Sequence, residues 1–130
     1  FSLDFEEVKQ NARSILQNLS DDRFTNFSMH GDEYADRLVP TEYIKVHTRY
    51  ENRCIANKLL CKELLQRGFI SQAQCDAMTE CSQNMLEDIG QVKYILMRQQ
   101  KTGRPLKLEL IEKLWSNVIQ TEKEMWKSIV

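Results

Sequence analysis

Hydrophobic residues recur every three or four positions along most of the chain, which is the spacing of one face of an α-helix. Residues 3–19 show this pattern first, with Glu6, Lys9 and Arg13 on the opposite side. This segment is predicted to form an amphipathic helix. Its apolar positions are Leu3, Phe5, Val8, Ala12, Ile15, Leu16 and Leu19.

The pattern stops after Leu19 and returns only after Pro40. Residues 20–40 mix polar residues and helix breakers with aromatic residues and have no sustained period. They are predicted to form a long connection, with room for a short helix over 32–38. The connection is long enough for the chain to cross over before the next helix.

Three further helices are predicted after Pro40. Thr41 is a candidate cap for a helix that runs to Arg67 and ends at Gly68. Ser71 and Gln74 have the spacing of a capping box, so a third helix is expected from there to about residue 101. A fourth helix follows from about residue 106, after the breaker sequence KTGRP.

The last two helices carry clear apolar stripes. The stripe of the third helix is Met78, Met85, Ile89, Val92 and Leu96. The stripe of the fourth is Leu108, Ile111, Leu114 or Trp115, Val118, Met125 and Ile129. Four amphipathic segments without an alternating strand pattern predict an all-α antiparallel bundle of about four helices, formed by residues 1–130 as one domain.

Composition and charge narrow the classes of function. The 130 residues are 42% hydrophobic and 28% charged, as in globular helical proteins, and their formal net charge is −1. A chain so close to neutral has no strong positive electrostatic field to attract a polyanion. Neither nucleic acid nor an anionic membrane is therefore an expected partner. No apolar run approaches the ~20 residues that span a bilayer, so membrane insertion is not expected.

All four cysteines lie on either side of Gly68. Pairs within one helix, Cys54 with Cys61 and Cys75 with Cys81, would be about 10 and 9 Å apart, beyond the ~7 Å reach of a disulfide. Nested bridges from Cys61 to Cys75 and from Cys54 to Cys81 share one antiparallel register. These two bridges are the leading prediction, although Cys75 and Cys81 point about 120° apart on an ideal helix.

Two alternatives remain for the cysteines. The first is four reduced thiols that behave as small buried hydrophobic residues in an intracellular bundle. The second is a zinc site, which is disfavoured because close ligand pairs are missing. Two glycosylation sequons, at Asn18 and Asn26, favour an oxidising, secretory environment together with the disulfides.

Motifs for catalysis or cofactor binding are missing from the sequence. No phosphate-binding glycine loop, nucleophile elbow or His-Glu zinc motif occurs, so we expect no enzyme, cofactor or metal. His30, beside Asp32 and Glu33, is interpreted as a loop histidine among solvated acids. His47 lies on the apolar face of the second helix and is interpreted as a core or interface histidine.

A surface for a protein partner is the remaining candidate for function. The loop between the third and fourth helices carries four basic residues, either solvated or in contact with an acidic partner: Arg98, Lys101, Arg104 and Lys107. Trp115 and Trp126 lie eleven residues apart on nearly one line of the fourth helix. Both can be core residues, or one can be displayed as a binding anchor.

The leading hypothesis is a secreted, disulfide-bonded helical bundle that works by binding a protein. Examples of this class are a cytokine-like ligand, a salivary or parasite effector, and an ectodomain module. The alternatives are an intracellular adaptor or assembly domain with reduced thiols, and a carrier that holds a small apolar ligand between its helices.

Overall fold

The structure is an all-α bundle, as predicted. It is a computed structural model that describes residues 3–19 and 37–130, and no strand occurs within these ranges. The helices, in chain order, are α1 (Phe5–Asn18), α3 (Thr41–Gln66), α4 (Gln72–Thr102) and α5 (Leu108–Lys127). Residues 32–36 of the short helix predicted over 32–38 lie outside the described residues, and Arg37 and Leu38 are not helical.

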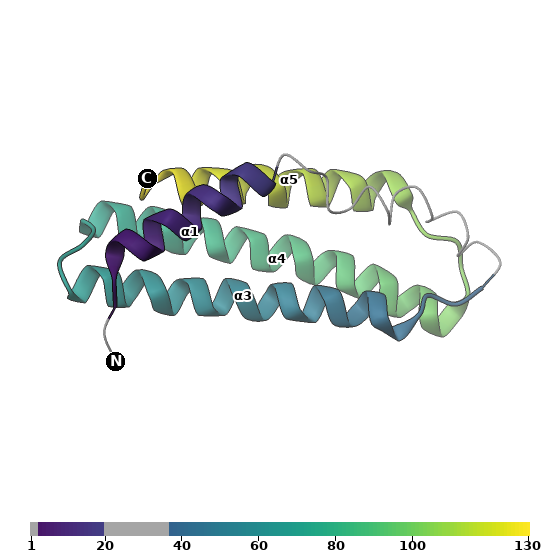
Figure 1. The fold of residues 1–130 in the computed structure, drawn as a ribbon. Coiled ribbons are helices and arrows are strands. Elements are labelled where there is room, and N and C mark those ends of the chain that lie inside the picture. Colours follow the sequence, from purple (N-terminus) through teal and green to yellow (C-terminus); the bar gives the residue numbers. More distant parts are fainter. Residues whose placement is uncertain (1–2, 20–36) are drawn as a thin grey trace.

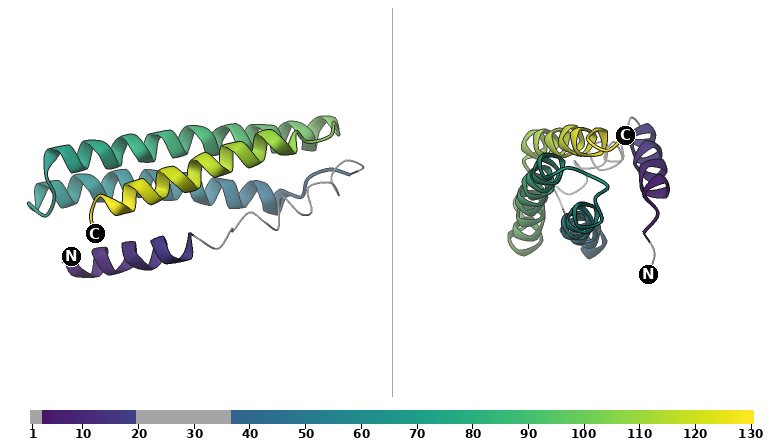
Figure 2. Two further views of the ribbon diagram at one scale, coloured as in Figure 1. Left: turned by 90° about the horizontal axis from the view of Figure 1, so that it is seen from above. Right: turned by 90° about the vertical axis from the view of Figure 1, so that its left-hand side faces the viewer.

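The three long helices run up and down beside one another, with α4 packed against both α3 and α5 (Figure 1). The shorter α1 packs against α5, and the end view in Figure 2 shows it beside the C-terminal end of that helix. The ring of Phe5 stacks on the ring of Phe69 with 5.0 Å between centroids, which joins the start of α1 to the α3–α4 turn. The α4–α5 connection lies at the opposite end of the bundle (Figure 1).

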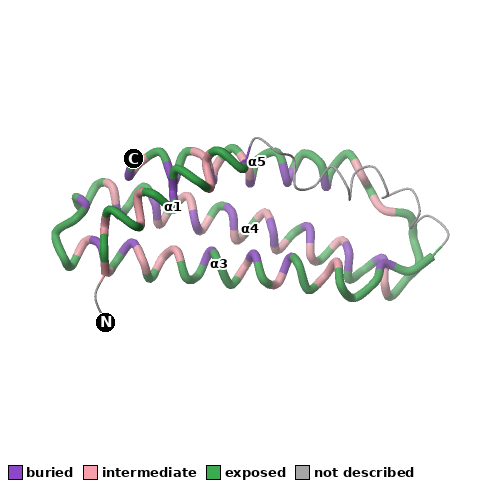
Figure 3. The backbone as a smooth tube through the Cα atoms, viewed as in Figure 1, coloured by how far each residue is buried: buried purple, intermediate pink, exposed green. Residues whose placement is uncertain are grey.

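The core follows the apolar stripes predicted for the last two helices. Buried residues recur along the inward sides of α3, α4 and α5 (Figure 3). All five predicted stripe residues of α4 are buried, and on α5 only Leu108 of the predicted set stays half-buried. Burying such side chains contributes roughly 1.5–3 kcal/mol each relative to exposure, so these stripes fix how the helices face one another.

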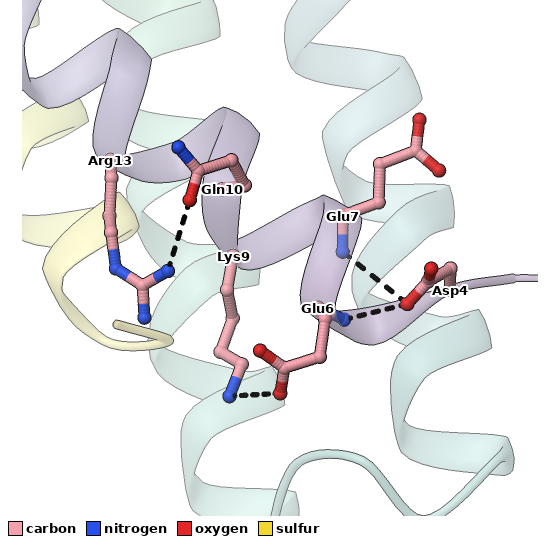
Figure 4. A network of polar contacts seen from close by, with 6 residues as sticks. All are labelled: Asp4, Glu6, Glu7, Lys9, Gln10 and Arg13. Carbon is pink, nitrogen blue, oxygen red and sulfur yellow. Dashed lines mark hydrogen bonds and ion pairs between the residues drawn. The ribbon is translucent and has the colours of Figure 1, made fainter.

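The start of α1 is capped by a residue that the sequence analysis did not single out. The Asp4 carboxylate accepts hydrogen bonds from the backbone N–H groups of Glu6 and Glu7, at 3.0 and 3.4 Å (Figure 4). An ion pair of 2.8 Å between Lys9 and Glu6 follows on the same turn (Figure 4). An aspartate cap satisfies amides that the first turn leaves unpaired, which typically stabilises a helix by about 1 kcal/mol.

The predicted cap of α3 is wrong. Pro40 occupies the N-cap position, Thr41 is the first helical residue, and no side chain caps this helix. The Thr41 hydroxyl instead accepts a hydrogen bond from the side-chain amide of Gln100, at 3.2 Å. Pro40 itself is extended, with φ −62° and ψ 146°, and its carbonyl accepts a hydrogen bond from the Tyr43 N–H at 3.1 Å.

The α3–α4 turn is confirmed in detail. Gly68 adopts a left-handed φ of 77°, and the N–H groups of Gly68 and Phe69 donate to the carbonyls of Leu65 and Leu64. This pair of bonds is the Schellman motif that commonly ends a helix at glycine. Ser71 and Gln74 then form both hydrogen bonds of the predicted capping box.

The predicted disulfides are absent from the structure. Cys54, Cys61, Cys75 and Cys81 are all free thiols, of which the first three are buried and Cys81 is half-buried. The reason lies in α4, which is already a regular helix from Gln72 onward. Six residues of regular helix turn Cys81 about 120° away from Cys75, so two nested bridges cannot share one register.

Three of the four thiols, those of Cys54, Cys61 and Cys75, lie in the apolar core. Burial raises the pKa of Cys54 to about 11, and the carboxylate of Glu122 adds to this effect. Burial and the neighbouring thiols of Cys75 and Cys81 raise the pKa of Cys61 to about 11 as well. Because the thiolate is the reactive form, Cys54 and Cys61 are poor nucleophiles and poor metal ligands at neutral pH.

Among the residues that the structure describes, Gly90 is the one glycine inside a helix, and its replacement should stabilise the bundle. A methyl group at this position would meet the Glu51 carboxylate at 3.9 Å, an ordinary van der Waals contact. Gly90→Ala is therefore expected to raise the free energy of unfolding by about 0.5–1 kcal/mol in urea denaturation followed by circular dichroism. Gly68→Ala is the control and should lower it by about 1 kcal/mol, because φ is 77° there. A loss of stability in Gly90→Ala would contradict this expectation.

Candidate functional site

A surface cavity lies where α4 ends and α5 begins. Its volume is about 320 Å³, and it is lined by the last two turns of α4, the α4–α5 connection and the first turn of α5. Its apolar lining consists of Tyr94, Ile95, Pro105, Leu106 and Leu110. Its basic lining consists of Arg98, Arg104 and Lys107. No acidic side chain occurs among the described residues that line it.

A second cavity of about 570 Å³ continues the first along the same two helices. The two cavities share Tyr94, Ile95 and Leu110 in their lining, so they adjoin on one face of the bundle. The second extends along α4 to Gly90 and Glu87, which carries the acidic group at this end. We refer to the two cavities together as the α4–α5 groove.

The end of α4 that carries the groove is tied to the chain entering α3. The side chain of Gln99 is buried, accepts a hydrogen bond from the Val39 N–H at 2.7 Å, and donates one to the Arg37 carbonyl at 2.8 Å. Gln100 adds a hydrogen bond to the Val39 carbonyl at 3.2 Å. Because Gln99 also lines the first cavity, these bonds hold part of the groove wall in place.

Tyr94 and Leu110 give the groove its accessible apolar surface. Tyr94 is 64% exposed and Leu110 is 40% exposed, although both are large apolar residues. Neither residue was predicted from the sequence, because both lie off the buried stripes. Tyr94 lies midway between the buried Val92 and Leu96, and two residues are 200° on a helix, so its position off the stripe was the available signal.

The basic residues predicted from the sequence lie at this groove, with one exception. Arg98, Arg104 and Lys107 are exposed and line it, whereas Lys101 is exposed but does not line it. The α5 helix also begins here at Leu108, without a side-chain cap from Lys107. Backbone N–H groups at such a helix start are hydrogen-bond donors for a carboxylate.

Both tryptophans are core residues, so the idea that one of them is displayed for a partner is wrong. Trp115 is 3% exposed and Trp126 is 5% exposed. Trp115 packs edge-on against Tyr50, with 5.4 Å between ring centroids, and lies 5.2 Å from the ring of His47. The stripe of α5 turns both indoles toward the bundle interior, where they fill space between helices.

A buried carboxylate is the most polar feature of the core. Glu122 is 1% exposed and accepts hydrogen bonds from the Tyr50 hydroxyl and, at 3.4 Å, from the Trp126 indole N–H. The Arg53 guanidinium lies 3.6 Å from the same carboxylate and 5.0 Å from the centre of the Tyr50 ring. Because the carboxylate is paired and hydrogen-bonded, this cluster is interpreted as a structural part of the core.

His47 is buried, which confirms the prediction of a core histidine. Its Nδ1 donates to the Tyr43 carbonyl at 2.6 Å. Burial lowers the pKa of His47 and outweighs the opposite effects of that hydrogen bond and of Glu51, while Lys93 lowers it further. The imidazole is therefore neutral at pH 7.

The remaining residues singled out from the sequence are only partly described. Asn18 is exposed at the last residue of α1. Asn26 and His30 lie outside the described residues. Glycosylation at Asn18 and Asn26 stays a prediction.

Comparisons with protein-family models, with curated proteins and with solved structures found no match. Across residues 3–19 and 37–130, no three histidine, cysteine or acidic side chains are grouped so that they could hold a metal ion. None of the described helices has both the length and the apolar character needed to cross a membrane. The α4–α5 groove is the surface feature where exposed apolar and basic side chains lie together.

Proposed function

We propose that the chain is a non-enzymatic binding protein that acts through protein–protein contacts at the α4–α5 groove. The observation that carries this proposal is the combination of accessible apolar side chains with a basic rim in one depression. Binding sites commonly join an apolar floor with a few polar groups that fix orientation. Aromatic residues and arginine, here Tyr94 and Arg98, are the types most often found to carry binding energy.

The thiols bear on which kind of binding protein this is. The predicted disulfides favoured a secreted ligand, an effector or an ectodomain module, and the structure has four free thiols in their place, three of them buried. Reduced buried cysteines favour the intracellular adaptor or assembly domain, because disulfides persist chiefly in oxidising compartments. The groove lies at the surface, with exposed residues in its wall, which suits a docked chain segment better than an enclosed apolar ligand.

The proposal is tested by selecting peptides from a displayed random library on the whole chain and mapping the bound peptides by amide chemical-shift changes. Enriched peptides are expected to perturb residues 90–110. Tyr94→Ala/Leu110→Ala should weaken their binding by roughly tenfold or more with little loss of stability, because both side chains are exposed.

The matched control removes comparable apolar surface elsewhere. Ile55 and Leu59 are 48% and 62% exposed on α3 and do not line the groove. Ile55→Ala/Leu59→Ala should leave peptide binding unchanged. Loss of binding in this control alone, or the absence of any selected peptide, would show that the groove is not the binding site.

A further inference from the structure

The charge of the groove changes sign along its length. Arg98, Arg104 and Lys107 surround the end at the α4–α5 connection, while Glu87 lies at the other end. The polar cavity beyond Glu87 includes Asp88, whose pKa is raised by burial and by the Glu87 carboxylate. The chain as a whole is nearly neutral, so the three cations form a local feature. An occupant that matches this pattern is acidic at one end.

The groove also has the length of a helix. Its wall on α4 runs from Glu87 to Thr102, which at 1.5 Å per residue is about 22 Å, or four helical turns. Its apolar middle, around Tyr94, Ile95 and Leu110, is accessible to side chains from outside. A helix that places apolar residues at positions i, i+3, i+4 and i+7 into such a groove is a common mode of peptide recognition.

We propose that the occupant of the α4–α5 groove is an amphipathic α-helix of about four turns from a partner protein, with glutamates or aspartates at the end that meets Arg98, Arg104 and Lys107. This inference rests on the proposed function, that the chain binds protein partners at this groove. The guanidinium groups of Arg98 and Arg104 can each take a carboxylate through two N–H donors. The apolar side of the helix covers Tyr94 and Leu110.

The test uses three synthetic 16-residue helical peptides with the same leucine positions and either glutamate, glutamine or lysine at the charged positions. Affinity for the whole chain is measured by fluorescence anisotropy. The glutamate peptide is expected to bind roughly tenfold tighter than the glutamine peptide, and the lysine peptide more weakly than both. Raising the salt concentration should reduce these differences, because the charges are exposed.

Charge reversal gives the sharpest comparison. Arg98→Glu/Arg104→Glu should reverse the preference, so that the lysine peptide binds tighter than the glutamate peptide. Lys45→Glu/Arg49→Glu makes the same change in charge at two exposed positions of α3 that do not line the groove. This control should keep the preference of the unchanged chain.

Each other outcome overturns the inference in a distinct way. Equal binding of the three peptides would contradict the acidic end of the partner helix, and the groove would then be a site for apolar helices. If none of the three peptides binds while library peptides still perturb residues 90–110, the helical occupant is contradicted. The proposed function is unaffected by that result. If the library selection also yields no peptide, both the helical occupant and the proposed function are contradicted.

Two further occupants are separate outcomes. Binding to phosphatidylserine vesicles that is lost in Arg98→Glu/Arg104→Glu, without peptide binding, would replace the protein partner by a lipid surface. Concentration-dependent dimers that Tyr94→Ala/Leu110→Ala disrupts in sedimentation equilibrium would make a second copy of this chain the occupant.

Discussion

Replacing Trp115 with alanine is expected to lower the free energy of unfolding by about 3–5 kcal/mol. The indole is buried against Tyr50 and His47, and its removal leaves a cavity that the surrounding helices can close only in part. Urea denaturation followed by circular dichroism measures the loss directly. If the urea concentration at the midpoint falls while the slope of the unfolding free energy against urea concentration is unchanged, the folded bundle persists in the variant.

Tyr94→Ala is the control for this prediction, because Tyr94 is also a large aromatic residue of the bundle but lies mostly in solvent. Its stability should change by less than about 0.5 kcal/mol. Equal effects of the two substitutions would contradict the placement of Trp115 in the core.

Removing the positive partner of the buried carboxylate is the second large change. Arg53→Met is expected to lower the free energy of unfolding by about 1–3 kcal/mol, because it leaves the buried Glu122 side chain without its ion-pair partner and with only neutral donors. The effect should stay below that of a fully buried ion pair, since the Arg53 side chain is partly exposed. Methionine keeps an apolar stem beside the ring of Tyr50.

A double-mutant cycle separates the charge from the packing. In a Glu122→Gln background the same Arg53→Met substitution should cost less, by about 1 kcal/mol or more, because no buried charge is then left unpaired. Strictly additive effects in the same denaturation experiment would mean that Arg53 acts only through its contact with the Tyr50 ring.

The fold was predictable because its signals are local. The stripe from Met78 to Leu96, the stop at Gly68 and the Ser71–Gln74 capping box each depend on residues a few positions apart, and the structure has all three. The misplaced start of α3 shows the limit of such signals. Thr41 was available as a cap, but its hydroxyl bonds to Gln100 of α4, which is a tertiary contact.

The candidate site was only half predictable. The basic residues Arg98, Arg104 and Lys107 were visible as a cluster in the sequence, but the groove between them depends on how α4 and α5 pack. The cysteines misled because the prediction gave more weight to their matched spacing from Gly68 than to the 120° that separates Cys75 and Cys81 on an ideal helix. Glu122 stands on the apolar stripe between Val118 and Met125, so a paired, buried carboxylate was foreseeable in principle, whereas its partners on α3 were not.

Because of the way α1 is attached, the helices differ in the free energy needed to open them locally. α1 packs against α5 and reaches the α3–α4 turn through Phe5, whereas α4 is held along its length by both α3 and α5. Partial opening that detaches α1 therefore needs less free energy than opening that separates α4 from its neighbours. Amide hydrogens of α1 would then exchange with solvent through openings that leave the three long helices together, and the α4–α5 groove would stay assembled throughout them.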